Sequence, residues 1–254
     1  MRHAFLDHHS GIESPIHHLD ARAKILVFFT IILVGVSSPP ISFLLFGLLA
    51  LVLVGIALLA RLPLIHLAKK VFVILPFLFF VVLSIPFMKK DSMGGYNLGL
   101  GGLSVSQSGL WILWNVMIKS SLGVFAIILL YSTTPFPQLI KGLERLGSPK
   151  VFTVLISFMY RYSFILIDEM QRMKRARDSR SFGERWFYQL KTMGHMIGTL
   201  FLRSFNRGER VYFAMLSRGY HGTMPEGTLG RFGPGEIIFL SLSPLLILLR
   251  IFLK

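Results

Sequence analysis

Long apolar runs constrain what this chain can fold into more than any other feature of the sequence. Residues 24–37, 41–60, 71–88 and 237–253 are almost entirely apolar. A helix needs about 20 apolar residues to cross the hydrocarbon core of a bilayer, and these four runs reach or approach that length. Because 53% of the whole chain is hydrophobic as well, the sequence predicts an all-α integral membrane protein.

Two further segments bring the expected number of transmembrane helices to five or six. Residues 109–131 are apolar apart from Asn115 and Lys119, which lie four apart on one helix face. An ionisable group at this depth is costly unless protein shelters it, so Lys119 either belongs to an internal polar pathway or binds backbone carbonyls inside the bundle. We favour the second, because true charge pathways are rare. A sixth span requires residues 186–205 to enter the bilayer.

The formal net charge of +15 indicates how the spans are oriented. Lys and Arg concentrate on the cytoplasmic side of membranes, and residues 132–233 carry the largest basic surplus. We therefore expect N-terminal transmembrane helices in residues 1–131, a cytoplasmic region in 132–233 and a C-terminal transmembrane helix in 234–254. Lys89 and Lys90 are the exception, since this orientation puts them outside. The chain is expected to be a multi-pass membrane protein.

The cytoplasmic region is expected to contain long amphipathic helices. Residues 133–135 offer an N-cap and a helix-starting proline, and Gly147 can end the short helix that follows. Residues 151–167 are apolar but include Arg161, which favours a helix lying across the cytoplasmic end of the bundle over a span. The apolar stripe of the short helix would consist of Leu139, Leu143 and Leu146.

Two arginines stand out from the many basic residues of this region. Arg180 and Arg218 each lie between small residues at the end of an expected helix, where a planar guanidinium can reach into a groove of a partner. Three other arginines and Arg218 fall within an arc of roughly 80° around the expected helix, so the four form one stripe. These can either meet lipid phosphates or give supporting contacts to the same partner. The stripe contains Arg203, Arg207 and Arg210.

Several strings, taken in their order, resemble the transmembrane T component of energy-coupling factor (ECF) transporters, the cobalt-type CbiQ and EcfT group. The resemblance covers nearly the whole chain. This sequence departs from the family's usual residues in two modest ways. Ala21 stands where the family often has proline, and Ser217 stands where it often has alanine. The strings are Leu19-Asp20-Ala21-Arg22-Ala23-Lys24, Thr134-Pro135 with Gly142-Leu143-Glu144-Arg145-Leu146-Gly147, and the motifs Ser179-Arg180-Ser181 and Ser217-Arg218-Gly219.

This resemblance implies a non-catalytic scaffold in an ABC-type importer. In that family the T component holds a substrate-binding membrane subunit against cytoplasmic ATPases, and two coupling helices each place one arginine in an ATPase groove. Here those arginines are Arg180 and Arg218. The resemblance leans toward cobalt or nickel uptake, with a T component shared among vitamin importers as the alternative. No cofactor is expected.

Other classes of protein receive less support from the sequence. The chain has no cysteine, no Walker-type loop and few carboxylates in its spans, which disfavours a membrane enzyme. A stand-alone channel or secondary transporter with a lipid-binding basic surface remains the rival class, although no internal repeat is evident. Nucleic acid is disfavoured because membrane topology explains the charge. Five N-terminal histidines are weak candidates for a metal site: His3, His8, His9, His17 and His18.

Overall fold

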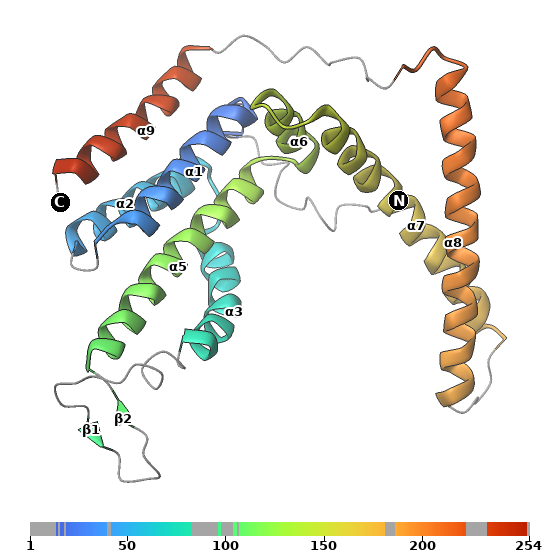
Figure 1. The fold of residues 1–254 in the computed structure, drawn as a ribbon, viewed down its shortest axis with the longest axis horizontal. Coiled ribbons are helices and arrows are strands. Elements are labelled where there is room, and N and C mark those ends of the chain that lie inside the picture. The colour runs from blue at the N-terminus through green and yellow to red at the C-terminus, as the bar shows by residue number, and fades with distance from the viewer. Residues whose placement is uncertain are drawn as a thin grey trace. The chain divides into compact units, whose positions relative to one another are not determined.

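The computed structural model describes two groups of helices (Figure 1). The described residues are 14, 16–17, 19–39, 42–82, 96–97, 104–105, 107–180, 186–221 and 233–252. One group, the bundle, belongs to residues 4–142 and 229–254, and the other, the two-helix unit, to residues 1–3 and 143–228. The domain boundaries expected after residues 131 and 233 stay predictions.

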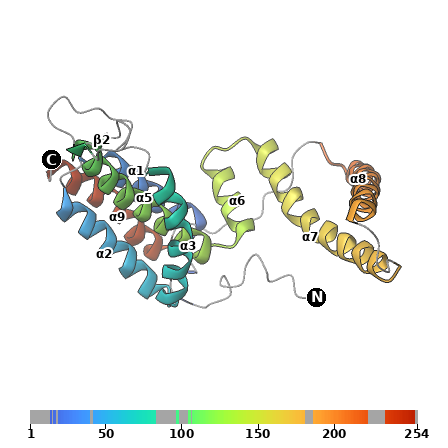
Figure 2. The same ribbon diagram turned by 90° about the horizontal axis from the view of Figure 1, so that it is seen from below.

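Among the described residues of the bundle, five helices pack side by side (Figures 1 and 2). Helix α1 packs against α9, α5 and α2, and α5 also packs against α3 and α2. A two-residue antiparallel ladder pairs β1, Tyr96–Asn97, with β2, Ser104–Val105. The helices are α1 Ala21–Ser37, α2 Phe43–Leu59, α3 Leu64–Val82, α5 Gln107–Thr133 and α9 Pro234–Phe252.

Apolar side chains cover the outside of the bundle as well as filling its centre. Val27, Phe28 and Leu53 are fully buried, whereas Phe29 and Leu51 remain 58% and 72% exposed. A water-soluble bundle would bury one stripe of each helix and cover the other with polar groups. Apolar residues on both sides of the helices are what a lipid environment requires, so the all-α membrane architecture expected from the sequence is confirmed.

Three described helices have the length and hydropathy to cross a membrane. They are the Gly109–Thr133 part of α5, α9, and Lys150–Asp178, which is α7; α2 is apolar but shorter. The expectation that residues 151–167 lie across the end of the bundle stays a prediction. The helix that contains residues 186–205 does not reach the same hydropathy, so a sixth span there has no support among the described residues.

Two lysines connect opposite ends of α1 and α5. Lys24 is completely buried, and its Nζ donates to the carbonyl oxygen of Thr133, the last residue of α5, at 3.0 Å. Lys119 Nζ donates to the carbonyl oxygens of Val36 at 3.0 Å and Ser38 at 2.7 Å, at the end of α1. The carbonyls at a helix C-terminus lack intrahelical partners and attract cations. The interpretation of Lys119 as a ligand of backbone carbonyls is therefore confirmed.

The short helix α6, Phe136–Arg145, packs on the first turn of α1. A Cβ at Gly142 would lie 3.0 Å from Ile25 Cδ1 and 3.1 Å from Ala21 Cβ, so only glycine permits this approach. The predicted short amphipathic helix is confirmed. The buried residues are Ile140 and Gly142, because the backbone at Gly142, rather than a row of leucines, contacts α1; Leu143 and Leu146 are exposed.

Candidate functional site

The candidate site lies on the two-helix unit, in which α7, Lys150–Asp178, packs against α8, Trp186–Leu216. Pro149 precedes α7 and Gly147 ends α6 with a φ of 103°, a conformation that glycine adopts without strain. The first part of α7 is apolar, and basic residues dominate after Asp168. Because both helices are long, the residues at their C-termini lie far from the residues at which they begin.

Arg180 is exposed just beyond the C-terminus of α7. Its backbone N–H donates to the carbonyl oxygen of Arg177 at 2.9 Å, which continues the last turn, and Ser179 Oγ donates to the carbonyl oxygen of Ala176 at 3.0 Å. Its side chain borders a groove of about 330 Å³ between the two helices, where Thr192 and His195 of α8 form the opposite side. Ser181 lies outside the described residues.

Arg218 is the residue at which α8 stops. The N–H of Tyr220 donates to the carbonyl oxygen of Met215, and that of Gly219 to Leu216, both at 3.0 Å, which is the Schellman pattern of a helix end. Gly219 has a φ of 79°, as this pattern requires. Ser217 Oγ donates to the carbonyl oxygen of Phe213 at 2.7 Å. The prediction that Gly219 ends the helix is confirmed, and Arg218 is exposed.

The two arginines lie at opposite ends of the two-helix unit. Arg180 lies beside Thr192, near the start of α8, and Arg218 lies at the end of the same helix. At 1.5 Å of rise per residue, about 40 Å of helix separates Thr192 from Arg218. The unit therefore presents two widely spaced guanidinium groups, each free to enter a separate groove of a partner.

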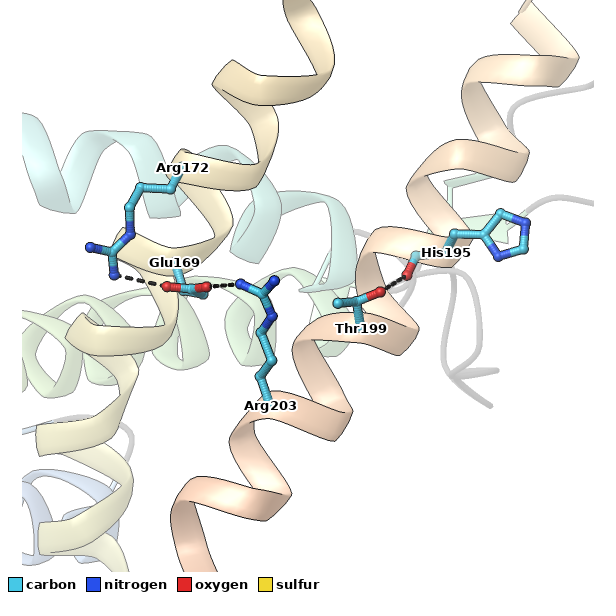
Figure 3. A network of polar contacts seen from close by, with 5 residues as sticks. All are labelled: Glu169, Arg172, His195, Thr199 and Arg203. Atoms are coloured by element: carbon cyan, nitrogen blue, oxygen red, sulfur yellow. Dashed lines mark hydrogen bonds and ion pairs between the residues drawn. The ribbon is translucent and has the colours of Figure 1, made fainter. Parts of the chain in front are cut away.

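A carboxylate between the arginines joins the two helices (Figure 3). Glu169 on α7 accepts from Arg172 Nη2 at 2.8 Å and from Arg203 Nη1 on α8. The Glu169 side chain is 19% exposed, whereas those of Arg172 and Arg203 are 59% and 58% exposed. Nearby in the figure, Thr199 Oγ1 donates to the carbonyl oxygen of His195 within α8 at 2.9 Å.

Sequence reasoning did not identify Glu169 as a site residue. The charge pattern could have identified it. Glu169 is one of few acidic residues in a basic segment, and two basic helices that pack together need a negative charge between them. The three stripe arginines lie together on the same side, where they line a hollow of about 170 Å³ with Glu169. These arginines are Arg203, Arg207 and Arg210.

The N-terminal histidines do not gather into a metal site in the part of the chain that is described. His17 Nδ1 lies 2.6 Å from Ser14 Oγ, and the carbonyl oxygen of His17 accepts from Lys24 Nζ at 3.2 Å. Within those residues, no group of three metal-ligating side chains forms. His17 thus has a structural role, whereas His3, His8, His9 and His18 lie outside the described residues.

Comparison with known proteins identifies the family. The family model of the cobalt transport protein CbiQ matches residues 13–228. The chain belongs to the CbiQ family. It is therefore a membrane component of a cobalt or ECF transport system and, with its several apolar helices, a multi-pass protein of the prokaryotic plasma membrane.

Three relatives illustrate the breadth of this CbiQ family. An uncharacterised protein of Methanocaldococcus jannaschii is 29% identical over 86% of this chain and 75% of its own length. The energy-coupling factor transporter transmembrane protein EcfT of Staphylococcus aureus is 32% identical over 82% of this chain and 81% of its own. A fused cobalt transport protein, CbiMQ, of Methanocorpusculum labreanum is 25% identical over 87% of this chain, which spans only 38% of that protein.

The structure brings together two of the strings on which the family resemblance rests. Lys24 of the first string binds the carbonyl of Thr133, next to the Thr134-Pro135 turn, and Gly142 of the second string packs on Ala21 of the first. Asp20 starts α1 by accepting from the backbone N–H of Arg22 at 3.0 Å. In this CbiQ-family chain, both strings therefore fix α6 to the end of the bundle.

Proposed function

We propose that this chain is the coupling subunit of an ECF-type importer, which transmits the motion of cytoplasmic ATPases to a substrate-binding membrane subunit. The observation that carries the proposal is the exposure of Arg180 and Arg218 at opposite ends of one helix pair. Each guanidinium can bind a carboxylate or a set of carbonyls in one ATPase subunit. Membership of the CbiQ family and the relative named EcfT support the same assignment.

The chain itself would be non-catalytic in this complex. Its sequence holds no Walker-type phosphate loop, so ATP would be hydrolysed by partner chains. Closure of two ATPase subunits would change the distance between Arg180 and Arg218, and α7 would transmit that change through Pro149 and Gly147 to α6. Because α6 is docked on α1 through Gly142, the motion would reach the membrane bundle.

Cobalt is the substrate that the comparisons favour, with nickel as its close chemical neighbour. The matching family is described as cobalt transport protein, and one relative is a fused cobalt transport protein. The alternative that the family resemblance implies is a T component of a vitamin importer, and one relative is named as an energy-coupling factor transporter protein without a stated substrate. We infer that the separate membrane subunit, rather than this chain, recognises the substrate.

Affinity purification from the native membrane tests this function. The wild-type chain is expected to retain an ATPase and a second membrane protein, whose identity would name the substrate class. The Arg180→Glu, Arg218→Glu variant should lose the ATPase, because both guanidinium contacts become repulsive. The matched control is Lys69→Glu, Lys70→Glu, which changes the charge equally at exposed positions of α3, outside the helix pair. Absence of any ATPase from the wild-type preparation would contradict the proposal.

A further inference from the structure

The hollow between α7 and α8 has a chemistry that the coupling function does not use. Its lining contains three arginines and a single carboxylate, together with Ser204 and Asn206 as further polar groups. Glu169 is already occupied, since one oxygen accepts from Arg172 and the other from Arg203. The hollow therefore keeps an excess of positive charge. We call it the arginine hollow.

Two of its arginines have unused hydrogen-bond donors. Among the residues that the structure describes, neither Arg207 nor Arg210 forms an ion pair with a carboxylate. Arg210 Nε donates to the carbonyl oxygen of Asn206 at 3.2 Å, which orients the guanidinium and leaves its terminal nitrogens available. Because the two residues lie three apart on α8, their side chains point to the same face. A single anion in the hollow can accept from both.

Apolar surface borders the arginine hollow. Leu166 of α7 and Leu200 of α8 belong to its lining. Met170, one helical turn after Leu166 on the same face of α7, is 51% exposed. An anion that carries hydrocarbon chains would place its charge on the arginines and its chains on these side chains. A purely acidic protein surface would leave the apolar residues in water, which is unfavourable.

We propose that the arginine hollow binds the phosphate of an anionic phospholipid and thereby holds the helix pair at the membrane surface. Arg207 and Arg210 donate to the phosphate oxygens. The hydrogen bond from Arg203 to Glu169 holds the Arg203 side chain in the lining of the hollow. The acyl chains lie along the exposed apolar side chains of α7 and α8. This assignment separates the stripe arginines from Arg180 and Arg218, and it does not depend on the identity of the transported substrate.

Native mass spectrometry of the full-length chain, in the complex with which it purifies, tests the proposal. The probes are phosphatidylglycerol and phosphatidylcholine with the same acyl chains, and inorganic phosphate as competitor. Wild-type protein is expected to bind phosphatidylglycerol more tightly than phosphatidylcholine. Arg207→Gln, Arg210→Gln should lose about twenty- to thirty-fold in affinity for phosphatidylglycerol, on the basis of roughly 1 kcal/mol for each arginine near an anionic lipid.

The control variant Lys174→Gln, Arg175→Gln removes two charges from α7 outside the hollow and should bind as wild type does. Equal binding of phosphatidylglycerol by wild type and the Arg207→Gln, Arg210→Gln variant overturns the proposal. Displacement of the lipid by an equal concentration of inorganic phosphate would assign the hollow to a free anion. If the Arg207→Gln, Arg210→Gln variant still bound the lipid but lost a copurifying ATPase that the control variant kept, the hollow would be assigned to the ATPase. Either result also contradicts the lipid assignment.

Discussion

Individual lysines stabilise the bundle through backbone carbonyls rather than through carboxylates. Lys24 is fully buried and binds Thr133 across the bundle, and Lys119 binds the end of α1. Arg250 Nη2 adds a third cation at that end by donating to the carbonyl oxygen of Ser37 at 2.8 Å. Carbonyl oxygens at helix C-termini carry partial negative charge, and burying them without a hydrogen-bond donor costs free energy. Each lysine supplies such a donor and neutralises the helix end.

Replacement of Lys24 should destabilise the bundle. Lys24→Met keeps the length of the side chain but leaves the carbonyl of Thr133 without its buried donor, which costs about 1.5–3 kcal/mol for a hydrogen bond to a charged group. A lower Tm of the detergent-solubilised protein would report this loss. Lys70→Met, at an exposed position of α3, should leave the Tm unchanged. Equal Tm values for the two variants would contradict the role of Lys24.

Replacement of Lys119 should leave transport intact. Because its ammonium binds Val36 and Ser38 rather than a chain of polar groups, Lys119→Met is expected to lower the Tm while uptake per folded complex stays at the wild-type rate. Uptake by proteoliposomes, normalised to the amount of folded protein, measures this. A large loss of uptake at unchanged Tm would restore the polar-pathway interpretation.

Among the elements, α6 connects the bundle to the two-helix unit along the chain. Thr133 ends α5, Gly142 brings α6 onto α1, and Gly147 ends α6 before α7 begins. The expectation that residues 133–135 would cap α6 is wrong for Thr134, whose buried hydroxyl has no hydrogen-bond partner among the described residues. Close packing of α6, rather than a side-chain cap, therefore holds it.

Addition of a methyl group at Gly142 should loosen this junction. Gly142→Ala places a Cβ within 3.1 Å of Ala21 and should cost about 1–3 kcal/mol as α6 shifts outward. Thermal unfolding and ATP-driven uptake are expected to fall together. Gly123→Ala is the matched control, because no atom lies within 4 Å of a Cβ there and alanine favours a helix interior. A Gly142→Ala variant as stable and active as the control would contradict the packing role of α6.

For the whole molecule, the sequence predicted what depends on local patterns. Apolar runs located α5 and α9, which have the length and hydropathy to cross a membrane, and the shorter apolar α2, whereas α7, which also reaches that length and hydropathy, was not expected to be a span. Gly147 and Gly219 marked the ends of α6 and α8. It could not predict the contact between Lys24 and Thr133, 109 residues apart, or that between Glu169 and Arg203, 34 residues apart, because helical periodicity says nothing about which distant side chain meets which.

The central claim is that the two ends of the helix pair move when ATP binds to the partner subunits. Because the chain has no cysteine, spin labels can be attached at Lys174→Cys and Ala214→Cys, exposed positions between one and two turns before Arg180 and Arg218. Double electron–electron resonance on the purified complex then gives the distance between the ends of α7 and α8. The account predicts a shifted distance distribution with a non-hydrolysable ATP analogue and no shift when Arg180→Glu and Arg218→Glu are added. An unchanged distribution in an otherwise wild-type complex that hydrolyses ATP and transports its substrate would contradict it.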